Sequence, residues 1–186
     1  TDAMRGNPQR YAVRHGGAAL VVGYAPSVYQ DVEAARRLRP DAVMLGVKYS
    51  CALFPEIEHV WTQHLEQAKD IRAKAGRPVL IHGRPSRFQT RRIRWVTAGR
   101  DADLDFAWPE LRWVYGGSGF GAALWARHGM GFDEVILCGV PMEHGGYAPE
   151  IAAFKRPHAD RGRSFADVSQ LERWRAAIGE FAAQGK

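Results

Sequence analysis

The sequence contains few cysteines, and their spacing excludes two kinds of protein. Only Cys51 and Cys138 occur in 186 residues, far apart in the chain. Two distant cysteines make neither a disulfide framework nor a zinc site. Cys138 ends an apolar run, where a small buried side chain is expected. The cysteine usage therefore favours a reducing, cytoplasmic setting.

The chain also has no long hydrophobic run. No apolar stretch approaches the roughly 20 residues of a membrane-spanning helix, so we expect no membrane partner. Residues 1–16 are polar, without the apolar core of a signal peptide, and are expected to lead into one domain over residues 17–186. With 46% hydrophobic and 25% charged residues, the chain is long and apolar enough for a full globular core.

An excess of acidic residues is absent as well. The chain has 26 Lys and Arg against 20 Asp and Glu, a net charge of +6, which favours an anionic partner. The basic residues concentrate in RPSRFQTRRIR, Arg84–Arg94. Two interpretations stay open for this stretch: a solvated basic loop, or a surface that meets phosphates, those of nucleic acid included.

Short apolar runs alternate with helical patterns. Gly17–Tyr24 and Asp41–Val47 are continuous apolar runs, which predict strands covered on both faces. Between them, Ser27 is expected to cap a helix that begins near Val28 and stops at Pro40. Its apolar stripe is Val28, Val32, Ala35 and Leu38. This β-α-β unit implies parallel strands with a right-handed crossover.

The remaining segments continue this alternation. Residues 55–76 fit either one helix, Glu56 to Lys74, or a strand, EHVWTQ, followed by a helix from Leu65; the run Val60-Trp61-Thr62 favours the strand. Further strands are expected at Arg77–Gly83, Arg92–Gly99, Leu111–Gly117 and Asp133–Val140, and helices at Phe120–His128 and Asp167–Ala183, with little periodicity over Met142–Phe165. The pattern predicts a single Rossmann-like α/β domain, with a mostly parallel sheet flanked by helices.

Two glycine-rich turns are expected at the carboxyl ends of strands, where ligands bind in such sheets. They are GYAPS, Gly23–Ser27, and GGSG, Gly116–Gly119. Glycines let the backbone approach a ligand, and the N–H groups at a helix start attract an anion. The second turn is neither a GxGxxG motif nor a P-loop, and close packing of helix on strand explains it equally well. The expected substrate-binding residues are Gly23, Pro26, Ser27, Gly116, Gly117, Ser118 and Gly119.

Together the two turns carry a family resemblance. LVVGYAPS resembles the G-x-G-P-S turn of the sialyltransferase-like Rossmann superfamily, and GGSGFGAALWARHGMGFDEVILCGVPM resembles its second glycine turn, helix and strand. That superfamily includes bacterial CMP-sialic acid transferases and archaeal pterin pyrophosphokinase-like proteins, and small phage and prophage proteins carry a similar LCGVPM. The resemblance covers Ala18–Ser27 and Trp113–Met142.

The resemblance implies a transferase that uses a nucleotide-activated donor, above all a glycosyltransferase. The nucleotide sugar would be its substrate, and neither a cofactor nor a metal is implied. His158, downstream of the last strand, matches the family's general base, and His144 is the second candidate. Tyr147 lies in a stretch where the family's tyrosines steady the leaving phosphate, and Met142 follows the last strand at the edge of the substrate site.

The sequence departs from the family's pattern at three places. Tyr24 and Lys48 stand near positions where the family has asparagines, and Pro141 stands where the transferases have an aspartate. These departures remove two amides and a carboxylate expected around CMP-sialic acid. Lys48 could replace an amide's hydrogen bond by a point charge on a phosphate, or it could face solvent.

Other functions remain open from the residues alone. One is a non-catalytic nucleotide or nucleic-acid binding protein of the same fold, and another is a DNA-modifying glycosyltransferase with Arg84–Arg94 on the nucleic acid. Tryptophans could stack on bases, but Trp61, Trp95, Trp113 and Trp174 fall in apolar segments and are expected in the core. His64 and His82 are expected as half-buried strand-end residues or as lining of the pocket, and no spacing suggests a metal site.

Overall fold

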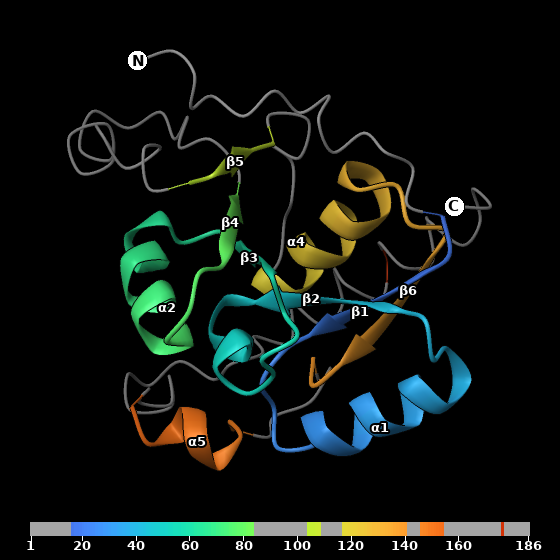
Figure 1. Cartoon of the computed structure of the whole chain (residues 1–186), viewed down its shortest axis with the longest axis horizontal. Coiled ribbons are helices and arrows are strands. Elements are labelled where there is room, and N and C mark those ends of the chain that lie inside the picture. The colour runs from blue at the N-terminus through green and yellow to red at the C-terminus, as the bar shows by residue number, and fades with distance from the viewer. Residues whose placement is uncertain (1–15, 84–103, 109–116, 141–145, 155–175, 177–186) are drawn as a thin grey trace.

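One fully parallel sheet forms the centre of the protein (Figure 1). The computed structural model describes residues 16–83, 104–108, 117–140, 146–154 and 176. Within them the strands are β1 (Ala18–Val22), β2 (Val43–Val47), β3 (His59–Thr62), β4 (Leu80–Gly83), β5 (Phe106–Ala107) and β6 (Glu134–Cys138), in the order β5-β4-β3-β2-β1-β6. Every neighbouring pair is parallel, which confirms the expected α/β fold.

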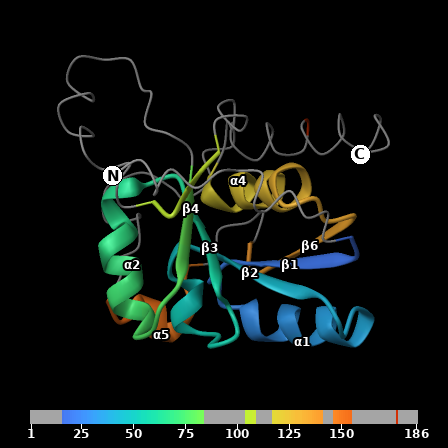
Figure 2. The ribbon, with the colours of Figure 1, turned by 45° about the horizontal axis from the view of Figure 1, so that its top comes forward.

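Helices cover both faces of the sheet. The α-helices are α1 (Val28–Leu38), α2 (Ala68–Ala75), α4 (Ser118–Leu124) and α5 (Pro149–Ala152), with 3-10 turns η3 (Lys48–Ala52) and η4 (Leu65–Gln67) and a π-helical turn η7 (Trp125–Gly129). Figure 2 shows α1 and α4 on opposite sides of the strands. Each face has its own apolar core, one shared with α1 and α2 and the other with α4.

The predicted β-α-β unit is confirmed, with two local corrections. Val28 and Val32 are buried against the sheet, but Leu38 is 69% exposed, because the last turn of α1 extends beyond the strands it covers. Ser27 occupies the N-cap position without a side-chain bond to the helix backbone. Its hydroxyl instead donates to the carboxylate of Asp31, one turn along, at 2.9 Å. A charged acceptor makes the stronger hydrogen bond.

The strand interpretation of residues 55–76 is confirmed. β3 is followed by the 3-10 turn η4 and then by α2, which ends at Gly76 in the left-handed conformation, φ 64°. One strand, one α-helix and the 3-10 turn η3 were not expected. β5 is only two residues long, too short to leave a pattern, and α5 forms one helical turn inside the stretch expected to be aperiodic.

The helix expected at Phe120–His128 is present but changes type along its length. After α4 the backbone widens into the π turn η7, closed by the bond from the Met130 N–H to the Trp125 carbonyl, 2.8 Å. A Cβ on Gly129 would lie 2.9 Å from the Trp125 ring and 3.3 Å from that of Trp108. Trp61, also buried here, stacks on Trp125 with ring centroids 5.7 Å apart. These three tryptophans serve the core, as expected for Trp61.

Several expected elements lie outside the described residues. They are the lead-in, residues 1–15, the strands at Arg92–Gly99 and 111–116, the basic stretch Arg84–Arg94 and, apart from Ala176, the helix at Asp167–Ala183. No helix of the part that the structure describes is long and apolar enough to cross a membrane.

Candidate functional site

The order of the strands reverses at β1. The chain moves outward from β1 through β2 to β5, and then returns to place β6 on the other side of β1. In open parallel sheets, ligands bind beyond the carboxyl ends of the strands at such a reversal. The candidate site is therefore the carboxyl edge around β1, β2 and β6.

A backbone clasp holds the exits of β1 and β6 together. The Gly23 N–H donates to the Cys138 carbonyl at 2.7 Å, and the Ala25 N–H donates to the Gly139 carbonyl at 3.1 Å. A Cβ on Gly23 would lie 2.2 Å from the Gly139 oxygen, so only glycine allows this approach. The neighbour of the first glycine turn is thus the turn after β6. We call these contacts the β1–β6 clasp.

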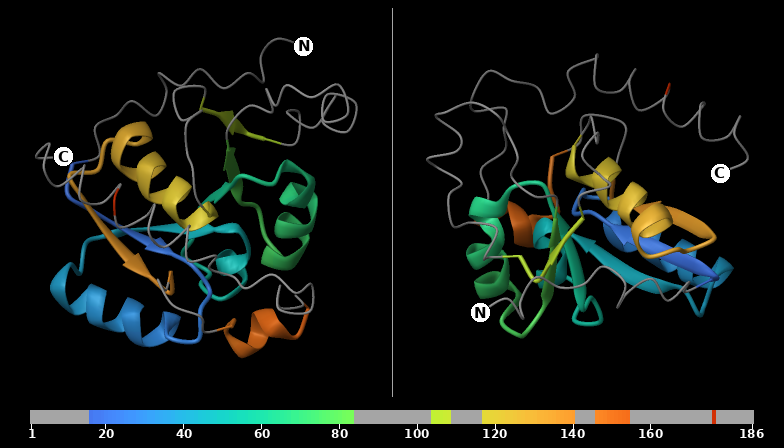
Figure 3. Two further views of the ribbon diagram at one scale, coloured as in Figure 1. Left: turned by 180° about the vertical axis from the view of Figure 1, so that it is seen from behind. Right: turned by 90° about the horizontal axis from the view of Figure 1, so that it is seen from above.

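The second glycine turn reaches the same edge of the sheet from the face of α4. The end of this helical segment lies at the amino edge, because the N–H groups of Asp133 and Glu134 donate to the Gly17 carbonyl. Figure 3 shows the segment turning into β6 beside the start of β1. The seven residues of α4 rise about 1.5 Å each and η7 adds further length along the same direction, so Ser118 lies near the carboxyl ends. Its hydroxyl oxygen is buried and has no hydrogen-bond partner among the described residues.

Lys48 follows β2 directly and is the unusual residue of this edge. It is 8% exposed, and within the described ranges it alone among non-glycine residues has a positive φ, 51°. No hydrogen bond or ion pair joins its ammonium to the described parts of the chain. Burial lowers the pKa of Lys48 to about 8, against an opposing pull from Glu66. The burial of Lys48 excludes the interpretation that its side chain faces solvent. The other interpretation, a point charge that can meet a phosphate, remains.

The strand register places polar groups beside Lys48. Val47 pairs with Trp61, so Lys48 lies level with the exit of β3, where Gln63 follows. The amide nitrogen of Gln63 is buried and has no partner within the described structure. Glu66 lies nearby, but its carboxylate is half exposed and meets the His64 ring at 3.1 Å. The carboxylate whose charge acts on Lys48 thus contacts His64 and does not form an ion pair with Lys48.

Aromatic rings cover the other side of this edge. The Tyr24 ring lies 5.3 Å from Tyr147 and 6.4 Å from Tyr49, centroid to centroid. The Ala148 N–H donates to the Tyr24 carbonyl at 2.8 Å, which holds the segment before α5 onto the edge. Burial raises the pKa of Tyr147 to about 12 and that of Tyr24 still further. The tyrosine hydroxyls therefore stay protonated at neutral pH.

Most of the expected binding residues lie at this edge. Those in the described structure are Gly23, Pro26, Ser27, Lys48, Gly117, Ser118, Gly119 and Tyr147. Gly116, Met142, His144 and His158 lie outside the described residues. Gln63 was missed, since a glutamine after a strand has no distinguishing pattern until the register is known.

His82 does not line this site and is fully buried, contrary to the expectation of a half-buried residue. Its Nδ1 accepts the Trp108 indole N–H at 3.0 Å, and its Nε2 lies 2.9 Å from the Nδ1 of His59. Burial, and then the neighbouring His59, lower the pKa of His82 well below its usual value. Because Nδ1 is an acceptor, neutral His82 carries its proton on Nε2 and donates it to His59. His64 is half exposed at the exit of β3, as expected.

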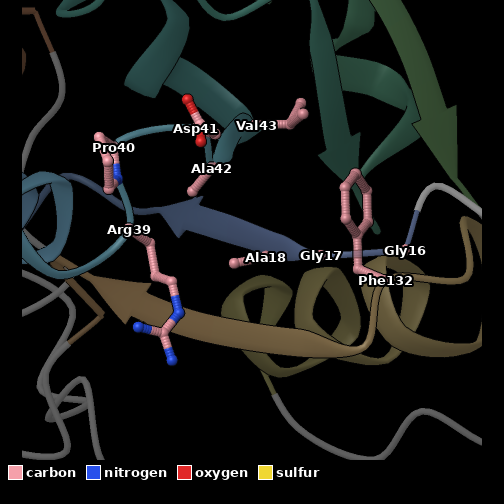
Figure 4. Close-up of a pocket in the computed structure, with 9 residues that line it drawn as sticks. All are labelled: Gly16, Gly17, Ala18, Arg39, Pro40, Asp41, Ala42, Val43 and Phe132. Carbon is pink, nitrogen blue, oxygen red and sulfur yellow. The ribbon is translucent and has the colours of Figure 1, made fainter.

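A hollow of about 380 Å³ lies at the opposite, amino edge of the sheet. Figure 4 shows its lining around the starts of β1 and β2, with Arg39, Asp41 and Phe132 among the side chains. Arg39 there pairs with Glu134 at 2.6 Å. This hollow is separated from Lys48 by the length of the strands and is not part of the site. No three His, Cys, Asp or Glu side chains of the described structure are grouped to hold a metal.

No protein-family model, curated protein or solved structure matches this chain. What the fold and the edge define is an α/β protein with a parallel sheet and a buried cationic group at the carboxyl end of a central strand.

Proposed function

We propose that this protein is a transferase that binds a nucleotide-activated donor at the carboxyl edge of its sheet, with a glycosyl group as the transferred unit. The observation that carries the proposal is Lys48, a buried ammonium on a left-handed backbone, without an acceptor among the described residues. Such backbone strain costs about 1–3 kcal/mol and tends to occur at functional sites.

An anionic ligand would supply what the site lacks. Burying a charged group without a partner is costly, so the ammonium either loses its proton or meets an anion. Gln63 and Ser118 add two further buried polar groups without partners in the described structure. An ammonium, an amide nitrogen and a hydroxyl can all donate, and a phosphate offers several acceptor oxygens.

The nucleotide part of the proposal has two supports. The reversal of strand order at β1 is where parallel α/β sheets bind such ligands. The two glycine turns resemble those of the sialyltransferase-like superfamily, and both reach this edge. Lys48 would stabilise the charge that develops on the leaving phosphate, and His158 would take the proton of an acceptor hydroxyl. Transfer then needs positioning and charge stabilisation, without a covalent intermediate.

Calorimetric titration with CMP-, CDP-, UDP- and GDP-linked sugars tests the binding step. One of these compounds is expected to bind, and Lys48→Met should weaken it at least tenfold, since one charge-assisted hydrogen bond contributes about 1.5–3 kcal/mol. Lys69→Met is the matched control, because it removes the same charge from an exposed position of α2. If none of the four classes binds, or if both variants bind like the wild type, the proposal fails.

Turnover of the bound donor tests the transferase itself. His158→Ala should lower it by about 10²–10⁴-fold and leave donor binding nearly unchanged, as expected when a general base is removed. Unchanged turnover in that variant would transfer the role to His144. A wild-type protein that binds a donor and neither hydrolyses nor transfers it would instead be the non-catalytic nucleotide-binding protein.

A further inference from the structure

Lys48 is held in place by its own turn. The Val47 N–H donates to the Ser50 hydroxyl at 2.9 Å, and the Cys51 thiol donates to the Lys48 carbonyl at 3.4 Å. η3 in turn packs on α2, on β2 and on β3. Backbone groups on both sides of the Lys48 Cα are thus bonded to side chains of η3, which fixes the backbone from which the buried Lys48 side chain departs.

The charged groups around Lys48 do not neutralise it. From η4, Glu66 is the one whose charge acts on the ammonium, and that carboxylate is half exposed and meets His64. From α2, Asp70 accepts the Tyr49 hydroxyl at 2.8 Å. The residues that follow β1 and β3 at this edge include Tyr24 and Gln63, which are uncharged at neutral pH. Among the described residues, the Lys48 ammonium therefore has no counter-ion.

We propose that binding at this edge is proton-coupled: Lys48 takes up a proton as an oxyanion enters, and releases it when the anion leaves. The inference rests on the proposed function in that it concerns the same site, but it does not depend on which oxyanion is bound. The lone pair of the Lys48 amine forms a new N–H bond with a proton from solvent. No bond of the anion breaks, and no other reactant is needed.

The physical reason is the difference between the empty and the occupied site. Burial lowers the pKa of Lys48 to about 8 when no anion is bound. An anion within hydrogen-bond distance favours the charged form and raises that pKa again. The affinity for the anion then depends on pH through the titration of Lys48, even when the anion itself does not titrate. It should fall as the pH rises above 8.

Sulfate is the probe, because it does not titrate near neutral pH and every proton taken up must go to the protein. In a pH-stat at pH 9, chloride is replaced by sulfate at constant ionic strength, and the acid needed to hold the pH is measured. With a pKa near 8, about nine-tenths of Lys48 starts deprotonated at pH 9 and about 3% at pH 6.5. We expect close to one proton per bound sulfate at pH 9 and almost none at pH 6.5.

Three variants separate Lys48 from its surroundings. Lys48→Met should abolish the uptake. Lys48→Arg should bind sulfate without uptake, because a guanidinium stays charged throughout this range. Lys69→Met should behave as the wild type. Absence of sulfate binding, binding without proton uptake at pH 9, or uptake that persists in Lys48→Met overturns the inference.

The two proposals can fail separately. If sulfate binds with proton uptake and no nucleotide-linked sugar binds, the proposed function fails and the proton-coupled anion site stands. If a nucleotide-linked sugar binds at pH 9 without proton uptake, the donor site stands and the coupling is rejected.

Discussion

The carboxylate of Asp31 on α1 accepts a hydrogen bond, 2.8 Å long, from the backbone N–H of Gly139 at the exit of β6. The same Oδ2 accepts the Ser27 hydroxyl at 2.9 Å. One side chain therefore connects the turn after β1 with the turn after β6 and supports the β1–β6 clasp. Gly139 has φ 61°, and a Cβ there would lie 2.6 Å from Val28. The turn after β6 therefore packs directly on the start of α1 and needs glycine at this position.

Removal of the Asp31 carboxylate should destabilise the protein. Asp31→Ala leaves the N–H of Gly139 without its acceptor, at a cost of about 1–3 kcal/mol in the free energy of unfolding. Asp31→Asn keeps a side-chain oxygen and should lose less. Urea unfolding measures both. Glu33→Ala, on the exposed side of α1, should stay within about 0.5 kcal/mol of the wild type. Equal stability of Asp31→Ala and the wild type would show that the hydrogen bond between Gly139 and Asp31 does not stabilise the β1–β6 clasp.

The close approach of Gly23 to Gly139 predicts a strong effect of one methyl group. Gly23→Ala would place a Cβ 2.2 Å from a backbone oxygen, which cannot rotate away. We expect a loss of at least about 3 kcal/mol, or failure to fold. A Cβ at Gly117 meets nothing within 4 Å, so Gly117→Ala is the control and should melt within a few degrees of the wild type. Equal melting temperatures of the two variants would show that Gly23 and Gly139 do not approach this closely in solution.

The sheet and its order of elements could largely be predicted from the sequence, because buried parallel strands leave continuous apolar runs. The strand at residues 59–62 was found from three β-forming residues alone. The pattern was wrong at Leu38, since helical spacing continues past the point where the sheet ends. β5 could not be found, because two residues carry no periodicity. Its place is set by β4, with which it pairs.

The lowered pKa of Lys48 predicts a rise in stability with pH. The folded pKa is about 8 and the unfolded value 10.5, so between these values the unfolded chain binds more protons. The cost of burying the charge is fully present below pH 8, at about 3 kcal/mol, and it diminishes toward pH 10. Lys48→Met should therefore be more stable than the wild type at pH 7, and this advantage should be smaller at pH 9.5. Urea unfolding at both values measures this, and an advantage that does not shrink with pH would contradict it.

His82 predicts a loss of stability in acid. Its folded pKa lies well below 6.5, so unfolding takes up a proton once the pH falls below about 6.5. His82→Phe should flatten the decline in unfolding free energy between pH 6.5 and 5. It should also cost about 1–3 kcal/mol at pH 7, since the Trp108 N–H loses its acceptor. His64→Phe, at a half-exposed position, should keep the decline of the wild type, and a decline that survives in His82→Phe would refute the assignment.

The site could be predicted only in part. The glycine turns, Lys48 and Tyr147 could be placed at strand ends from the order of elements. The left-handed backbone of Lys48 could not be predicted, because lysine has no preference for this conformation. It occurs where β2 turns into η3. The pairing of His59 with His82 depends on the register of β3 and β4, which neither strand specifies alone. The approach of Gly139 to Gly23 likewise depends on the pairing of β1 with β6, which neither strand specifies alone.

The central position of β1 has a consequence during synthesis. Ala18–Val22 pairs with β2 soon after it is made, but its other edge waits for β6, which follows more than a hundred residues later. At about 5–20 residues per second, that interval is on the order of ten seconds. Until then the apolar strand AALVV presents unpaired backbone groups, which can associate with other nascent chains. Expression yield should therefore depend on elongation rate and on chaperones that shield this strand.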